Sequence, residues 1–341
     1  MAKWKQVMSW VGGATAILTL IFGLQRLVGW IGDWREQRLQ IAELVALSVT
    51  QQETQHYPEA WASLTEAERL DAGNEDIRRA QEDLVMVWLR AARVRVGEQT
   101  FSDLVKPLVP VLERGALRAQ GQRKADLIAH AGWADFLRWR AGARDLAVDA
   151  HYSRALESDP SNPFAHAMWG HWILFAGGNV DAARQHFDNG LTAGREREYV
   201  RHMQLAALLN LSRERGLEEL LRLTNEMRLH NEEIGKSESD RVLWLACYAD
   251  LHGADSWTRS PTRIAPADEI ATLRWLYARG DPEGSRKDML DFCEARLHAL
   301  AGDRAKALEM LRQLQSEAAG DAIRDYAKQA VDRLSASAGQ S

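Results

Sequence analysis

Residues 162–191 read NPFAHAMWGHWILFAGGNVDAARQHFDNGL and contain the clearest pair of helices in the chain. The first helix is expected to begin at Pro163, because Asn162 is a good N-cap and proline is tolerated at the first helical position. The Gly-Gly-Asn break at 177–179 ends that helix, and three- and four-residue spacing of apolar residues then predicts a second one. We therefore interpret this stretch as a helical hairpin.

Small residues in this stretch stand where two helices could touch. Gly170 lies near the middle of the first helix, and Ala183, Phe187 and Gly190 follow one another at spacings of four and three in the second. Residues at such spacings share one face of a helix. The small side chains would let two antiparallel helices approach closely, and Phe187 would fill the space beside them.

The same arrangement recurs along the chain. No alternation typical of strands persists, and short breaks rich in Gly, Asn, Asp or Pro separate segments of helical periodicity. The chain is therefore expected to be all-α and built from short helical hairpins. Three further triplets share the spacing of four and three, namely Ala60–Leu64–Ala67, Val148–Tyr152–Ala155 and Ala307–Leu311–Leu314.

These repeats resemble the tetratricopeptide repeat (TPR) family. The repeat of that family spans about 34 residues, with small residues at its eighth and twentieth places and commonly a proline near its end. With Pro160 as such a closing proline, a repeat begins at Pro163 and Gly170 takes the eighth place. The resemblance implies an α-α superhelix, a tetratricopeptide-like solenoid, and unrelated helical hairpins are the alternative. The copies span residues 41–76, 125–160, 162–191 and 288–321, with a weaker one at 198–227.

The resemblance also implies a binding surface. The first helices of such repeats line a concave groove that holds peptides or protein segments, and aromatic side chains with an occasional cation suit such a partner. The alternative is that these side chains pack between neighbouring repeats, as aromatic stripes commonly do. The repeat positions imply the groove residues Trp133, Phe136, Leu137, Phe164, His171, Leu174, Phe175, Met289, Phe292 and Arg296.

The amino-terminal forty residues differ from the rest. Val7 to Leu24 contain no charged residue, and a helix of that length covers about 27 Å, close to the hydrocarbon thickness of a bilayer. Two tryptophans flank each end of the apolar segment, as in the aromatic belt of a spanning helix. A cleaved signal peptide would need a cleavage site after the apolar run, and a core helix would carry a polar face. We therefore predict a transmembrane helix over residues 7–31.

A stripe of small residues in this segment would let a second membrane helix approach closely. The stripe predicts a homodimer through Gly12, Ala16, Thr19 and Gly23, although small residues are common in membrane helices in general. Basic residues on the two sides of the span are nearly balanced, so the side of the membrane that holds the large domain stays open. We expect a single-pass protein located in a bacterial inner (plasma) membrane.

These observations predict the domain organisation. Two segments of the repeat region fit the repeat poorly and are candidate insertions, residues 75–124 and 231–287. The predicted parts are a short basic tail (1–6), the transmembrane helix (7–31), a juxtamembrane stalk (32–40), the repeat domain (41–335) and a flexible tail (336–341).

Charge and composition exclude several classes of protein. Acidic residues exceed basic ones by 48 to 43, for a net charge of −5, whereas a general nucleic-acid binder usually has a basic excess. Residues 1–40 hold five basic and two acidic side chains, which leaves a net of −8 for the rest. Two cysteines in 341 residues exclude a disulfide framework.

The sequence lacks the common motifs of catalysis and of metal or cofactor binding. There is no glycine-rich phosphate loop, dinucleotide fingerprint, paired-His zinc helix or Cys-x-x-Cys. Cys247 and Cys293 stand in apolar helical segments, where a free cysteine commonly packs as a small hydrophobe. We therefore expect no catalytic residues, no metal and no cofactor.

Together the patterns predict a membrane-anchored, non-catalytic scaffold that binds a protein or peptide partner through a concave groove. The alternative is a regulatory or sensor subunit, in which residues 75–124 and 231–287 bind a small ligand or gate an associated effector. An unrecognised enzyme is a third and weaker hypothesis, because the motifs of catalysis are missing.

Overall fold

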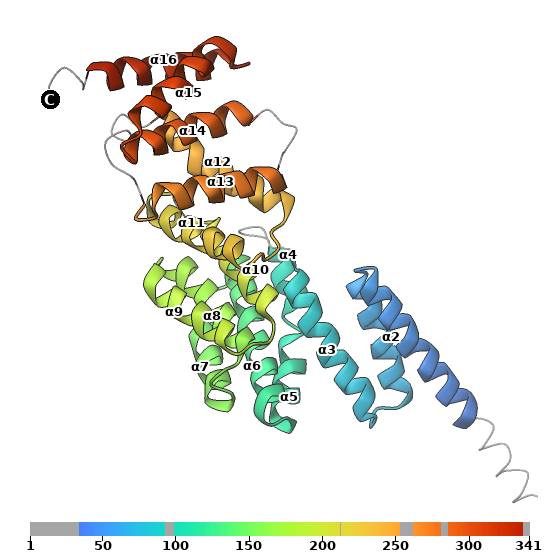
Figure 1. The fold of residues 1–341 in the computed structure, drawn as a ribbon. Helices are drawn as coiled ribbons and strands as arrows, with labels where there is room; N and C mark the ends of the chain where they lie inside the picture. The colour runs from blue at the N-terminus through green and yellow to red at the C-terminus, as the bar shows by residue number, and fades with distance from the viewer. Residues whose placement is uncertain (1–33, 93–98, 212, 253–261, 281–285, 337–341) are drawn as a thin grey trace, which may run out of the picture. The chain divides into compact units, whose positions relative to one another are not determined.

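The computed structural model describes residues 34–92, 99–211, 213–252, 262–280 and 286–336. Within these ranges every regular element is an α-helix and no strand occurs (Figure 1). The expected all-α fold is therefore confirmed. Many consecutive helices pack on one another, an arrangement consistent with a helical solenoid.

The chain divides into two compact units, residues 1–151 and 152–341, and the division falls inside α7 (Val148–Ser158). The first unit contains a helix over residues 34–53, α2 (Tyr57–Leu70), α3 (Glu75–Ala91), α4 (Gln99–Val105), α5 (Val109–Arg118) and α6 (Gly121–Arg140). The second unit continues with α8 (Pro163–Ala176), α9 (Val180–Thr192), α10 (Arg197–Leu208), α11 (Arg213–Leu229), α12 (Lys236–His252), α13 (Pro266–Gly280), α14 (Lys287–Leu300), α15 (Arg304–Glu317) and α16 (Asp321–Ala336).

In the first unit the predicted triplet of α2 is buried. Ala60 and Leu64 form a cluster with Leu84 of α3, and Val45 of the first helix packs against it. Asn74 begins α3, because its side chain accepts hydrogen bonds from the backbone N–H groups of the next turn. Residues 57–91 thus form a helical hairpin with the first helix packed alongside.

In the second unit α8 packs against α9 and α10, and α14 packs against α15, which in turn packs against α16. Leu311 and Leu314 of the predicted triplet in α15 lie in one buried cluster with Phe292 of α14 and Ala327 of α16. The core of this unit therefore consists of layers between successive helices, each layer filled by a few side chains.

The hairpin predicted for residues 162–191 forms as α8 and α9. The Asn162 side chain accepts a hydrogen bond of 2.9 Å from the backbone N–H of Ala165, with Pro163 at the first helical position. Asn179 caps α9 in the same way. Between the helices Gly178 has a φ of +66°, a left-handed conformation that favours glycine. The helix start and stop predicted from these residues are confirmed.

Gly170 brings α8 into close contact with α9. A β-carbon added at Gly170 would lie 3.0 Å from two ring carbons of Phe187 and 3.1 Å from the carbonyl oxygen of Ala183. Both Ala183 and Phe187 are 1% exposed. The close approach that the small residues predict is therefore confirmed, and Phe187 occupies the space next to Gly170.

Replacing Gly170 by valine should destabilise the second unit. The added side chain meets a buried ring and a backbone oxygen that cannot move freely, and overpacking of this kind costs about 1–3 kcal/mol. Urea unfolding followed by circular dichroism measures the change. Gly177→Ala is the control, because nothing lies within 4 Å of a β-carbon added there. Equal unfolding midpoints for the two variants would contradict the prediction.

The segments predicted to be atypical also contain helices. Residues 75–124 hold α3, α4, α5 and the first turn of α6, and residues 231–287 hold α12 and α13. The predicted boundary between stalk and repeat domain, at residue 40, lies inside the continuous helix over residues 34–53.

The predicted transmembrane helix over residues 7–31 lies outside the described residues, as do Gly12, Ala16, Thr19 and Gly23. Among the helices that the structure describes, none combines the length and the apolar character needed to cross a membrane.

Candidate functional site

Most of the residues expected to line a groove are buried by the protein itself. Phe175 is half-buried and keeps some accessible surface. A side chain that is covered by its own chain offers no surface to a partner, so for these residues the groove expectation is corrected. The buried ones are Trp133, Phe136, Leu137, Phe164, His171, Leu174, Met289, Phe292 and Arg296.

In the first unit, Trp133 and Phe136 of α6 pack against each other with ring centroids 4.7 Å apart. Trp133 also donates a hydrogen bond of 3.0 Å from Nε1 to the carbonyl oxygen of Leu89 in α3. These contacts tie α6 to α3, which is the packing role that the sequence left open as the alternative.

The expected groove residues of α8 face α10 instead. Phe164 meets Tyr199 with ring centroids 5.1 Å apart. His171 donates from Nδ1 to the carbonyl oxygen of Met203 at 3.1 Å. Phe175 stacks on the His171 ring at 4.9 Å. This side of α8 is therefore occupied by the next helix of the array.

Near the carboxyl terminus, Arg296 is 1% exposed and its Nη2 lies 3.9 Å from Oε1 of Glu269, which is 3% exposed. Thr262 donates a hydrogen bond of 2.8 Å to the same carboxyl group. Burial raises the pKa of Glu269, and the hydroxyl of Thr262 and the Arg296 charge oppose that shift. Arg296 thus serves the packing of α13 on α14.

A surface hollow is formed elsewhere in the second unit, and we call it the α10–α12 hollow. It has a volume of about 570 Å³ and lies between the first turns of α10, the end of α11, the connection at 230–235 and the start of α12. Its walls consist of Arg197, Glu198, Arg201, His202, Leu205, Met227, Glu232, Glu233, Ile234, Gly235 and Glu238.

The hollow combines apolar and acidic surface. Leu205 and Met227 line the hollow but are buried, so of these three apolar side chains only the half-buried Ile234 keeps accessible contact area. Glu198 and Glu233 are exposed at the wall of the hollow. Such a surface suits a ligand that carries both an apolar group and positive charge.

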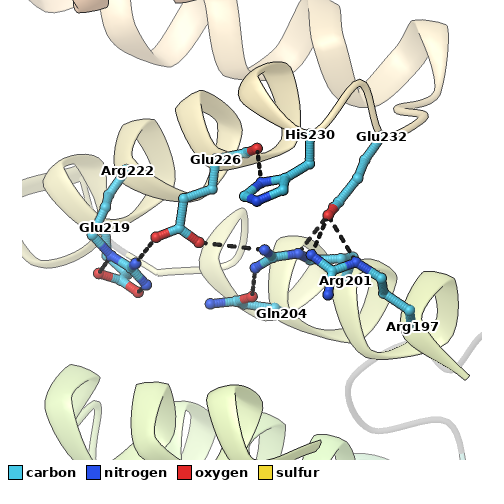
Figure 2. A network of polar contacts seen from close by, with 8 residues as sticks. All are labelled: Arg197, Arg201, Gln204, Glu219, Arg222, Glu226, His230 and Glu232. Atoms are coloured by element: carbon cyan, nitrogen blue, oxygen red, sulfur yellow. Dashed lines mark hydrogen bonds and ion pairs between the residues drawn. The ribbon is translucent and has the colours of Figure 1, made fainter. Parts of the chain in front are cut away.

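One wall of the hollow is held by a network of ion pairs (Figure 2). Arg201 is 5% exposed, and its guanidinium donates to Glu232 at 3.0 Å, to Gln204 at 3.1 Å and to Glu226 at 3.3 Å. Arg197 donates to the same Glu232 carboxylate at 2.5 and 2.9 Å. Two arginines of α10 therefore fix the connection that follows α11 over the hollow.

The network continues along α11 (Figure 2). Arg222 binds Glu226 and donates to Glu219 at 2.5 and 2.8 Å. The Glu219 carboxylate raises the pKa of Arg222, although burial opposes the shift. Beyond the residues drawn, Arg184 of α9 reaches Glu219 at 3.4 Å. Positive and negative charges thus alternate from α9 through α11 to α10.

This network of ion pairs is suited to holding the wall of the hollow in place rather than to proton transfer. The carboxylates of Glu219, Glu226 and Glu232 each accept from at least one arginine. A general base needs a carboxylate or imidazole that is free to take a proton. The imidazole of His230 donates to the carbonyl oxygen of Glu226 at 2.8 Å and so belongs to the same scaffold.

Sequence reasoning did not identify this site. Arg197 and Arg201 are spaced like any charged pair on an exposed helical face, and so are Glu219, Arg222 and Glu226. Arg201 is separated from Glu226 by 25 residues and from Glu232 by 31. The one usable signal was that Glu232 to Gly235 belong to a segment that already fitted the repeat poorly.

Replacing Arg201 by methionine should destabilise the second unit by about 1.5–3 kcal/mol, because a buried hydrogen-bonded charge is lost and two carboxylates lose a partner. Urea unfolding measures the effect. Arg69→Met is the control, since Arg69 pairs with Glu66 within one exposed helical turn, where little change is expected. If Arg201→Met unfolded at the same urea concentration as the control, the network would have no structural role.

A pair of histidines joins α8 to α9 in the second unit. His166 donates from Nε2 to the carbonyl oxygen of Pro160 at 3.0 Å, which leaves its Nδ1 as an acceptor for Nδ1 of His186, also at 3.0 Å. Trp169 packs on the His186 ring at 4.5 Å. Burial lowers the pKa of both histidines, and that of His186 falls to about 4, with the His166 charge as a second cause.

The histidine pair predicts a pH dependence of stability. Because the folded-state pKa of His186 lies below the value of about 6.5 in the unfolded chain, its contribution is complete above pH 6.5 and is lost as the pH falls towards 4. His186→Phe removes this titration and keeps a ring beside Trp169. Urea unfolding at pH 7.5 and pH 4.5 should therefore show a smaller loss of stability in the variant than in the wild type. An equal loss would refute the assignment.

Within the described ranges, no group of three or more His, Cys, Asp or Glu side chains is arranged to hold a metal ion. Comparisons with family models, with curated proteins and with solved structures found no match for this chain.

Proposed function

We propose that this protein is a membrane-anchored helical scaffold that binds a segment of another protein in the α10–α12 hollow. The observation that carries the proposal is the hollow itself, with apolar side chains in its wall, exposed carboxylates beside them and a neighbouring connection held by Arg197 and Arg201. A preorganised surface of this kind lowers the ordering cost of binding.

The charges of the hollow favour a basic partner segment. The two arginines are neutralised by Glu232 and Glu226, whereas no ion pair of the described residues involves Glu198 or Glu233. The net charge of the chain beyond residue 40 is also negative. A peptide with one or two basic residues and an apolar side chain would match both features.

Anchoring would strengthen such binding. The apolar run at residues 7–31 is the basis for the proposed anchor, in a bacterial inner membrane. A scaffold confined to a membrane surface meets a partner at the same membrane at a high effective concentration. A modest affinity of the hollow would then suffice to organise the partner there.

Site-specific photo-crosslinking in cells tests the proposal. A photoreactive amino acid at His202, which is exposed in the hollow, should form an adduct with one protein, and mass spectrometry should identify a basic and apolar segment as the point of attachment. The same amino acid at Gln185, exposed on α9, is the control. Equal adduct patterns at both positions, or none at His202, would count against the hollow as the binding site.

Charge reversal at Glu233 should weaken binding of the identified segment roughly 5-fold, because an attraction of up to about 1 kcal/mol at an exposed site becomes a repulsion. Fluorescence anisotropy with the labelled peptide measures the affinity. Asp332→Lys in α16, a reversal at another exposed carboxylate, is the matched control and should change the affinity little. If the peptide bound both variants as tightly as the wild type, the charge of the hollow would play no part in its recognition.

A further inference from the structure

The helix over residues 34–53 carries a regular stripe of residues on its outer face. They are exposed without exception, and the two largest apolar members, Leu39 and Val49, are 66% and 52% exposed. The spacing alternates between four and three residues, which is the pattern of a helix–helix seam. We call the stripe the outer seam, and it consists of Arg35, Leu39, Ala42, Ala46, Val49 and Glu53.

The opposite face of this helix is already occupied. Val45 packs on the cluster of Ala60, Leu64 and Leu84, and Ser48 is 5% exposed. Ser63 of α2 donates a hydrogen bond of 2.9 Å to the side chain of Gln51. The helix is therefore held in place by its inner face, and the outer seam points away from the other helices that the structure describes in the first unit.

The order of residues along the outer seam is self-complementary. A basic residue stands at one end and an acidic one at the other, with Ala42 and Ala46 in the centre. In an antiparallel pair with a two-fold axis, Ala42 of one chain meets Ala46 of the other, and Leu39 meets Val49. The same register sets Arg35 opposite Glu53 at both ends. A parallel pair would instead bring each charge against its own kind.

The charged ends are available for such contacts. Neither Arg35 nor Glu53 takes part in an ion pair with any described residue, and both are exposed. The alanines at the centre let two helices approach closely, since no large side chain separates the backbones. The end of a helical array normally carries a polar outer face, so an exposed apolar stripe here indicates a surface that another protein covers.

We propose that the outer seam is the interface between two copies of this chain, paired antiparallel through residues 35–53. The interface joins the first units of the two copies and does not involve the α10–α12 hollow. It also differs from the pairing predicted for the membrane segment, which involves residues within 7–31, whereas the outer seam lies within residues 35–53.

Disulfide trapping in the full chain, purified in mild detergent, tests the geometry. A mixture of Leu39→Cys and Val49→Cys chains should give a mixed disulfide dimer at least tenfold faster than either variant alone, because only the antiparallel register sets residue 39 against residue 49. The native Cys247 and Cys293 are buried and do not interfere. Faster trapping of Leu39→Cys with itself would overturn the proposal, and so would equal rates.

Charge exchange provides an independent test that does not depend on a new cysteine. Arg35→Glu and Glu53→Arg should each raise the dimer Kd at least tenfold in sedimentation experiments, and the double variant should return to within about twofold of the wild type. Leu39→Asn should also weaken the dimer, whereas Leu47→Asn, an exposed leucine on another face of the same helix, should not. A chain that stays monomeric at tens of micromolar, or a dimer that Leu39→Asn leaves intact, would overturn the proposal.

Discussion

Close contact between paired helices at small residues is the constraint on which the structure depends. Gly170 lies so near α9 that a β-carbon would already crowd Phe187 and the backbone of Ala183. Because the two helices touch there, one large side chain fills the layer and no broad apolar face is needed. The triplets of α2 and α15 repeat this solution within their own units. An array built in this way has thin layers, each with few side chains to hold its neighbours in register.

Ion pairs of buried glutamates join helices between which the apolar layers are thin. In both units a glutamate with little exposure meets an arginine from another helix, and an orphaned partner would be costly. Gly115 shows how the backbone makes room for such a pair, since a β-carbon there would lie 2.5 Å from Oε1 of Glu82. The pairs are Glu82 with Arg118 and Arg123, Glu219 with Arg184, Glu294 with Arg274, and Glu269 with Arg296. We infer that these pairs specify which helices stack, and that the wall of the α10–α12 hollow is the most extended example.

The success and the failure of the sequence predictions follow from the range of the interactions. Asn162 and Pro163 act within the first turn of α8, and Gly170 meets α9 within the same hairpin, so their roles could be predicted from nearby residues. The groove residues were transferred by repeat position, and that transfer assumes that the first helices leave one face open. His171 and Phe164 instead meet the next helix, α10, which covers that side of α8. The position of a residue in its repeat does not determine whether the next helix covers it, because that coverage depends on the orientation of the following hairpin.

The amino-acid sequence by itself determined that the chain is all-α, where several helices begin and end, and which small residues let α8 and α9 touch. Those properties depend on periodicity and capping over a few residues. Only the tertiary structure decided which aromatic side chains are buried and which arginines meet which carboxylates. The partners in the glutamate–arginine pairs named above lie between 20 and 41 residues apart, and these contacts exist only when the hairpins stack in one particular register. The α10–α12 hollow and the outer seam are consequences of that stacking, because each is surface that the stacked helices leave uncovered.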